Sequence, residues 1–225
     1  MPEVVPVYIL VPPEALLIDV AGPLEVLRYA NSEQSAVRFD YHYISTQARQ
    51  QTSIGLMLDG LEPLPECLPQ GAMLVVSGSL AVGEQALVAN AELVALRIWL
   101  RNVVAADTRL VTICSGALLA GAAGLLEGHA CTTHAECIDE LKALAPTANV
   151  LENRLYVEDR NRFSSAGIST GIDLMLHVVA QLTSAQVALL VARKMVIYLR
   201  RSGSDPQLSP WLSGRNHIHP AIHRM

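Results

Sequence analysis

The stretch VTICSGALLAGAAGLLEGHACTTH, residues 111–134, decides the predicted fold. It begins with an apolar run that ends at Cys114, continues at once into small residues and glycines, and closes with His134. A short apolar run of this kind is typical of a buried strand, and the segment after it is typical of a closely packed helix. The stretch therefore predicts a strand, a sharp turn at Cys114 and a helix, which is a building unit of α/β proteins.

Strand and helix signals alternate along the rest of the chain. Short runs rich in β-branched residues predict strands, and longer segments with a 3.6-residue apolar period predict helices. We predict strands at residues 5–11, 38–46, 52–54, 56–58, 72–78, 109–113 and 130–132, helices at residues 23–30, 84–104, 115–126, 135–144, 170–182 and 184–199, and a hairpin with its turn at residues 159–161. This alternation predicts an α/β fold, a three-layer sandwich with a mostly parallel central sheet and helices on both faces.

The composition fits one α/β domain with short appendages. Of the 225 residues, 51% are hydrophobic and 16% are charged, which is enough apolar material for one sizeable core. No apolar run approaches the roughly 18 residues that a membrane span needs, and the N-terminus has no basic segment of a signal peptide. We therefore expect a cytoplasmic protein whose cysteines are free thiols: Cys67, Cys114, Cys131 and Cys137.

The charge of the chain changes sign near residue 193. The net charge is −5, which argues against nucleic-acid binding by the whole chain. From Arg193 onward there are six basic residues and one acidic residue, whereas the preceding part is strongly acidic. The pattern predicts a domain at residues 1–200, followed at residues 201–225 by a linker and the start of a further domain. Because HPAIHRM is too short for a stable helix, we expect the natural chain to continue past Met225.

Three predicted strands are followed by polar or reactive groups at their carboxyl ends. These are Asp19, the Ser77-Gly78-Ser79 loop and Cys114-Ser115. Since ligands of open parallel sheets bind at the carboxyl ends of the strands, the three loops predict a shared pocket. The backbone N–H groups of Ser77–Ser79 are candidate anion donors, although an ordinary strand-to-helix turn explains this loop equally well.

Cys114 is the candidate reactive residue of this pocket. Its place before a helix predicts a lowered thiol pKa, because the helix N-terminus stabilises negative charge. His134 is a candidate base or anion partner, and Asp19 is a candidate proton or ligand partner. The alternatives are an inert buried cysteine, a structural histidine and a helix-capping aspartate. The spacing of Cys131, His134 and Cys137 resembles a metal motif, but a fourth ligand is missing, so we expect neither a metal nor a cofactor.

These motifs carry a resemblance to a known family. Asp19 in DVAGPLEVL, the Ser77–Ser79 loop, Cys114 in ICSGALLAGAAGLLEG and His134 in TTH resemble the PfpI/ThiJ superfamily, whose flavodoxin-like fold is related to class I glutamine amidotransferases. The segment SSAGISTGIDLMLHVVA, residues 164–180, and the sequence up to residue 212 resemble the amidotransferase-like sensor half of AraC-type transcriptional regulators. In those regulators, a linker and a helix-turn-helix DNA-binding domain follow.

The resemblance implies a ligand-sensing and dimerising domain with a degenerate cysteine-hydrolase-like pocket. The implied effector is a small nitrogenous or carboxylated metabolite, and DNA is contacted only through a C-terminal domain outside this chain. Cys114, His134 and Asp19 are the catalytic or vestigial residues. The implied ligand-binding residues are Asp19, Gly22, Ser77, Gly78, Ser79, Cys114, Ser115 and His134.

Two other functions remain open from the sequence. The chain carries Ser115 where peptidase-like superfamily members have histidine, and it lacks the late His-x-Glu pair of glutamine amidotransferases. The Asp-x-x-Gly-Pro setting of Asp19 is shared with isocyanide hydratases, so a stand-alone hydratase or hydrolase with Cys114 as nucleophile is the main alternative. A redox protein whose Cys114 is oxidised to sulfinate is the third possibility.

Overall fold

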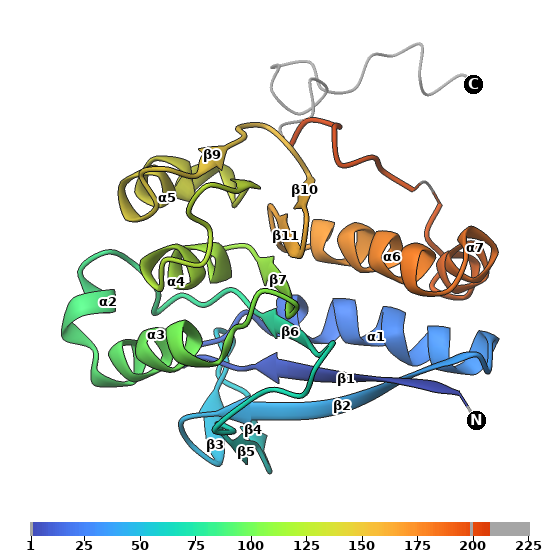
Figure 1. The fold of residues 1–225 in the computed structure, drawn as a ribbon, viewed down its shortest axis with the longest axis horizontal. Coiled ribbons are helices and arrows are strands. Elements are labelled where there is room, and N and C mark those ends of the chain that lie inside the picture. Colours follow the sequence, from blue (N-terminus) through green and yellow to red (C-terminus); the bar gives the residue numbers. More distant parts are fainter. Residues whose placement is uncertain (1, 199, 208–225) are drawn as a thin grey trace.

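A seven-stranded sheet forms the centre of the molecule in the computed structural model, which describes residues 2–198 and 200–207 (Figure 1). The strands follow the order β10-β11-β7-β6-β1-β2-β5, and all neighbours pair in parallel except β10 with β11. Their bounds are β1 (Glu3–Leu10), β2 (Val37–Ser45), β5 (Glu62–Pro63), β6 (Met73–Val76), β7 (Arg109–Ile113), β10 (Tyr156–Asp159) and β11 (Arg162–Ser165). The predicted mostly parallel sheet is confirmed.

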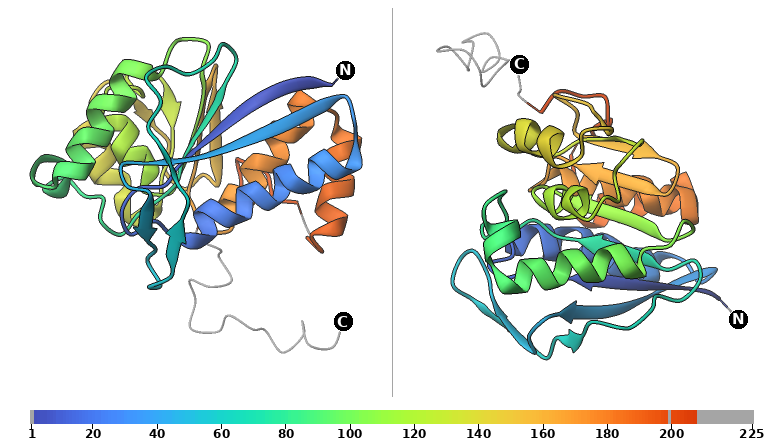
Figure 2. Two further views of the ribbon diagram at one scale, coloured as in Figure 1. Left: turned by 90° about the horizontal axis from the view of Figure 1, so that it is seen from below. Right: turned by 60° about the vertical axis from the view of Figure 1, so that its left-hand side comes forward.

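Helices cover both faces of this sheet, as the left view of Figure 2 shows. One face carries α1 (Leu17–Glu33), α6 (Thr170–Leu182) and α7 (Ala185–Lys194), and the other carries α2 (Ala86–Ala89), α3 (Ala91–Val103), α4 (Gly116–Ala122) and α5 (Ile138–Leu144). The smaller elements are the pairs β3 (Arg49–Gln51) with β4 (Met57–Asp59) and β8 (Ala130–Cys131) with β9 (Asn149–Val150), and the 3-10 turn η1 (Ala135–Cys137). The three-layer α/β sandwich is therefore confirmed. No helix within the described residues is long and apolar enough to cross a bilayer.

The central strands are apolar on both sides because both sides are covered. In β6, Met73 and Val75 belong to the core beneath α1 and α6, whereas Leu74 and Val76 belong to the core beneath α3 and α4. Successive side chains of a strand point to opposite faces, so a strand between two helical layers needs apolar residues at every position. This requirement explains why AMLVVSG reads as an uninterrupted apolar run rather than an alternating one.

Several helix boundaries differ from the predictions. Helix α4 ends at Ala122 rather than at residue 126, and the 3-10 turn η1 takes the place of the predicted start of α5. Helix α1 begins at Leu17, so Pro23 lies inside the helix rather than in its first turn. The predicted helix at residues 84–104 is split at Asn90, whose side chain accepts hydrogen bonds from the amides of Glu92 and Leu93 and so caps α3. Helix α7 ends at Lys194 rather than at residue 199, and Val196 has a left-handed φ of 56° that cannot continue a helix.

The chain after α7 turns back over the body of the protein. Residues 200–207 run from the C-terminal end of α7 above α6 towards β10, in red in Figure 1. The amide of Leu155 donates hydrogen bonds to the carbonyl groups of Gly203 and Asp205, which fixes this path. The remainder of the predicted linker, residues 208–225, and the predicted helix start at HPAIHRM lie outside the described residues.

Candidate functional site

Cys114 occupies the turn between strand β7 and helix α4, as the sequence predicts. Its φ of 54° lies in the left-handed region, which is costly for a residue with a β-carbon. Gly116 opens α4, and a β-carbon at Gly116 would stand 2.3 Å from the carbonyl oxygen of Val76. The glycine therefore allows the start of the helix to touch the backbone of β6, and this contact fixes the position of the turn.

Backbone from two other loops packs directly on Cys114. A β-carbon at Gly78 would lie 2.9 Å from Cys114 Cβ and 2.4 Å from Asp19 Oδ2, so all three residues meet. A β-carbon at Gly167 would lie 2.1 Å from Cys114 Cβ and 2.7 Å from its Sγ. The side chains of Cys114 and Asp19 are consequently 6% and 0% exposed. We call Cys114 and Asp19 the inner pair.

The electrostatics of the inner pair favour a protonated thiol. Burial raises the pKa of Cys114 to about 12, and the nearby charge of Asp19 acts in the same direction. The Ser115 amide lowers this pKa but does not offset the burial. The lowered thiol pKa predicted from the sequence is therefore wrong, because desolvation outweighs the helix N-terminus at a sealed position.

Asp19 lies in the first turn of α1 and reaches across to the loop that precedes α6. Its Oδ1 accepts a hydrogen bond of 2.7 Å from the amide of Ile168, whereas its Oδ2 is buried and has no hydrogen-bond partner among the described residues. Burial raises the pKa of Asp19 to about 6, against the lowering effect of the Ile168 and Gly78 amides and of His134. Asp19 therefore carries a proton in a sizeable fraction of molecules just below neutral pH.

His134 is not in hydrogen-bond contact with the inner pair. Its Nδ1 accepts a bond of 3.3 Å from the amide of Glu136, which caps the turn η1, and its side chain is one-third exposed. The residue that does contact the turn is Thr133, whose Oγ1 donates a bond of 2.8 Å to the carbonyl of Cys114. No motif in the sequence predicts this role of Thr133, because threonine is common beside buried strands.

The Ser77–Ser79 loop uses its polar groups within the protein. Ser115 Oγ accepts a bond from the Ser79 amide and donates one to the Ser79 carbonyl, each 2.9 Å long. Ser77 Oγ donates to the carbonyl of Leu10, and the Gly78 amide interacts with Asp19. The structure thus favours the ordinary turn over the anion-binding role for this loop.

Gly22 lies in α1 about one turn after Asp19. A β-carbon at Gly22 would stand 3.0 Å from Cγ1 of Ile172 in α6. The glycine therefore permits close packing of α1 on α6, and its contact with a ligand stays a prediction. No group of His, Cys, Asp and Glu side chains within residues 2–198 and 200–207 is arranged to hold a metal ion.

An open cleft of about 300 Å³ lies next to the inner pair, and we call it the outer cleft. Its walls come from the turn at η1, the loop before α6 and the chain after α7. The lining residues are His134, Ala135, Glu136, Leu155, Ala166, Gly167, Ile168, Ser169, Thr170, Arg201 and Gln207. Neither member of the inner pair lines it. The sequence predicted His134 as a site residue but did not predict the other residues that line the outer cleft, because they form no motif.

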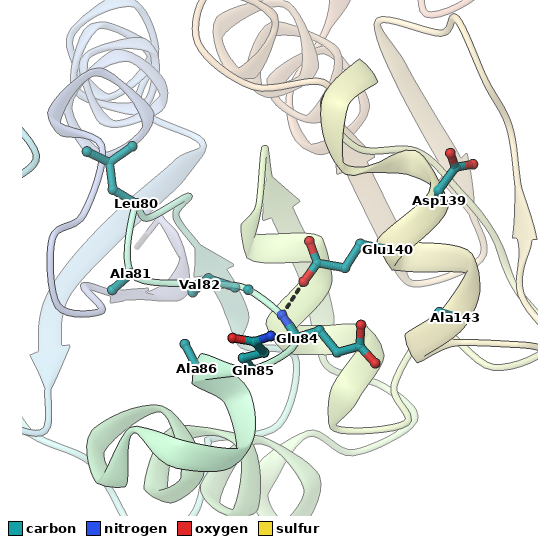
Figure 3. A pocket seen from close by; sticks show the side chains of 10 residues that line it. Leu80, Ala81, Val82, Glu84, Gln85, Ala86, Asp139, Glu140 and Ala143 are labelled. Carbon is teal, nitrogen blue, oxygen red and sulfur yellow. Dashed lines mark hydrogen bonds between the residues drawn. The ribbon is translucent and has the colours of Figure 1, made fainter.

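A larger open groove of about 730 Å³ lies between the loop after β6 and helix α5 (Figure 3). Its carboxylates come from Glu84, Asp139 and Glu140, and Glu140 accepts a hydrogen bond from the backbone amide of Glu84. The groove has no basic lining residue, and its lining includes neither Cys114 nor Asp19. It is therefore a separate acidic surface and not the pocket that the sequence predicts.

Comparison with known proteins places this geometry in a family. The model of the DJ-1/PfpI family matches residues 5–181. The chain belongs to the DJ-1/PfpI family. The predicted PfpI/ThiJ resemblance is thus confirmed. Among solved structures, an AraC family transcriptional regulator from Pseudomonas putida has a TM-score of 0.71 at 24% identity and covers 86% of this chain and all of that chain. Drosophila melanogaster DJ-1beta has a TM-score of 0.66 at 15% identity, covering 88% and 100%.

Curated relatives include both regulators and an enzyme. The transcriptional regulator GbdR of Pseudomonas aeruginosa is 30% identical over 199 residues, which cover 86% of this chain and 51% of GbdR. The regulator CdhR of the same species is 29% identical over 200 residues, covering 89% and 57%. The isonitrile hydratase of Pseudomonas putida is 30% identical over 185 residues, covering 80% and 72%. The chain therefore spans little more than half the length of the regulators that it matches.

Proposed function

We propose that this chain is the ligand-sensing and dimerising part of an AraC-type transcriptional regulator. The observation that carries the proposal is the match of about 30% identity to helix-turn-helix regulators over nearly the whole described body of the chain. The regulator acts in the cytoplasm and contacts DNA through a C-terminal domain outside residues 1–225. The domain at residues 1–200 receives the ligand, and the segment that begins at residue 201 connects it to the DNA-binding part.

The inner pair supports sensing rather than catalysis. A nucleophilic cysteine must be ionised and open to its substrate. Cys114 is nearly sealed by Gly167, its pKa is raised to about 12, and His134 is engaged with Glu136 rather than with the thiol. Cys114 and His134, which would form a catalytic centre, are therefore held in contacts within the protein.

The effector is a small nitrogenous or carboxylated metabolite that binds at the outer cleft and the inner pair. The buried Oδ2 of Asp19 has no hydrogen-bond partner among the described residues, and such groups are rare unless a ligand or water completes them. His134 and Arg201 supply positive or polarisable groups in the cleft, and Glu136 supplies a carboxylate. These groups suit a molecule with an amine or a carboxylate.

Dimer formation is supported by exposed apolar side chains near the start of α1 and on the β3–β4 hairpin. Ile18, Ile54, Leu56 and Met57 are each about half exposed or more. Burial of such side chains stabilises association. Light scattering of the purified chain tests the dimer, and Ile54→Glu should shift the mass to that of a monomer.

The sensor proposal is tested by titration calorimetry of the purified chain with a panel of amino acids, quaternary amines and short carboxylates. We expect at least one compound to bind, and His134→Ala to weaken that binding, because His134 lines the outer cleft. The full-length gene product should then change its DNA footprint with the same compound. Absence of a helix-turn-helix domain from the natural gene would contradict the proposal.

A stand-alone isonitrile hydratase is the second candidate, and the 72% coverage of that enzyme is the observation that favours it. Incubation with an alkyl isocyanide and measurement of the formamide product decides between the two. Turnover that disappears in Cys114→Ala would establish the enzyme and displace the sensor as the main function.

A further inference from the structure

The backbone between the inner pair and the outer cleft is strained. Gly167 and Ile168 both have positive φ angles, 90° and 54°. Glycine adopts this conformation freely, but for a β-branched residue such as isoleucine it is an outlier. Gly167 lies against Cys114, and Gly167 and Ile168 both line the outer cleft, so these two residues separate the inner pair from the cleft. We call Gly167 and Ile168 the gate.

Hydrogen bonds rather than apolar packing hold the gate closed. The Ile168 side chain is 48% exposed, so its burial contributes little. Its amide donates to Asp19 Oδ1 at 2.7 Å, and the Gly167 carbonyl accepts from the amide and hydroxyl of Thr170 at 3.1 and 2.9 Å. Strain of this kind persists only where the surrounding structure maintains it.

The segment after α7 is attached to the residue that follows the gate. Arg201 Nη2 donates a bond of 2.9 Å to Ser169 Oγ, and the same guanidinium binds the buried carboxylate of Asp173 at 2.5 and 2.9 Å. We call residues 200–207 the strap. The strap therefore anchors the far side of the gate.

The strap is also attached to the opposite wall of the outer cleft. Gln207 Nε2 donates a bond of 2.9 Å to the Thr133 carbonyl, and Thr133 Oγ1 in turn donates to the Cys114 carbonyl at 2.8 Å. Its middle is held by the Leu155 amide. The strap thus joins both walls of the cleft through Arg201 and Gln207.

We propose that the gate and the strap form one latch, so that opening the gate to expose the inner pair releases Arg201 from Ser169 and frees the strap. The functional part of this inference rests on the proposed sensor function. A ligand that reaches the Asp19 carboxylate from the outer cleft displaces Ile168, whose amide donates to Oδ1, and Ser169 follows because it is the next residue. Ligand entry therefore changes how residues 200–207, which connect the sensor to the proposed DNA-binding part, are held. The ligand acts by binding the open state more tightly than the closed one.

Site-resolved alkylation of the cysteines tests the latch without any ligand or DNA. The purified chain is treated with iodoacetamide at fixed pH, and the labelling of each cysteine is followed by peptide mass spectrometry. Arg201→Ala should raise the rate at Cys114 about tenfold or more, because the gate opens more often without its anchor. Arg200→Ala is the matched control, since Arg200 makes no hydrogen bond or ion pair with the described residues, and its rate should stay within about twofold.

Cys131 reports on global unfolding, because it is fully buried in the opposite core. An unchanged Cys114 rate in Arg201→Ala, or an equal rise at Cys131, would overturn the latch. Ser169→Ala removes one bond of the anchor without emptying the Asp173 site, and it should raise the Cys114 rate by a smaller factor. A failed latch leaves ligand binding and DNA recognition untouched, so its failure is distinguishable from failure of the sensor proposal.

Discussion

Only Gly167 and Ile168 separate the inner pair from the outer cleft, yet the two regions differ sharply in their exposure to solvent. Cys114 and Asp19 are both buried, Cys114 has a left-handed backbone conformation, and burial raises the pKa of both groups. The outer cleft is open, and Ile168 and His134 are half and one-third exposed. The motif around Cys114 therefore predicts where the site lies, whereas the burial of Cys114 determines whether its thiol can react.

The largest expected effect comes from adding a methyl group at Gly167, where the backbone packs on Cys114. In Gly167→Ala the new β-carbon would lie 2.1 Å from Cys114 Cβ, and alanine would have to adopt the φ of 90° that residue 167 has. The substitution should therefore lower the free energy of unfolding by about 3 kcal/mol. Gly71→Ala is the matched control, because Gly71 has a φ of 73° and no atom near its missing β-carbon, so it should cost only about 1 kcal/mol. Urea denaturation measures both. Equal losses in the two variants would show that the contact is not tight.

The second effect is a pH dependence that belongs to the inner pair alone. The pKa of Asp19 is raised in the folded state to about 6, so the folded state holds its proton more firmly than the unfolded chain. The stabilising contribution of Asp19 should therefore fall as pH rises from about 4 to about 7, by about 3 kcal/mol in total, and remain constant above. Asp19→Asn should remove this slope. Parallel curves of unfolding free energy against pH for wild type and variant would contradict the raised pKa.

A third, smaller effect concerns the hydrogen bond between Ser115 and the Ser79 amide. Ser115→Ala leaves the buried Ser79 amide without its acceptor and should cost about 1–2 kcal/mol in urea denaturation. Ser32→Ala, which removes an exposed hydroxyl, serves as the control and should cost less than about 0.5 kcal/mol. If both variants have the same stability as wild type, the loop is not held by Ser115.

The smallest effect is expected in the outer cleft. His134→Ala removes a partly exposed cap of η1, and its stability should stay within about 0.5 kcal/mol of wild type by thermal unfolding. A loss as large as that of Gly167→Ala would show that His134 belongs to the packed region rather than to the open one.

The sequence predicted the fold well where a pattern is local. Helix α6 has the bounds expected from its apolar period, and the turn at Cys114 follows from an apolar run before small residues. It predicted that Asp19 and Cys114 share a site, because both follow parallel strands. It mispredicted the Cys114 pKa, because burial depends on Gly167 and Gly78 from distant segments. The contacts of the strap could not be predicted for the same reason, since no motif in the sequence links Arg201 to Asp173.

We propose that Cys114 is a sealed, protonated thiol rather than a nucleophile, and the titration of Cys114 itself tests this proposal. The rate of Cys114 alkylation in the wild-type chain is followed from mildly acidic to alkaline pH by peptide mass spectrometry, with exposed Cys67 as the internal reference. We predict a rate at Cys114 far below that at Cys67 that is still rising above about pH 9. A fast rate that reaches its plateau below about pH 8 would reveal an activated thiolate and contradict the account.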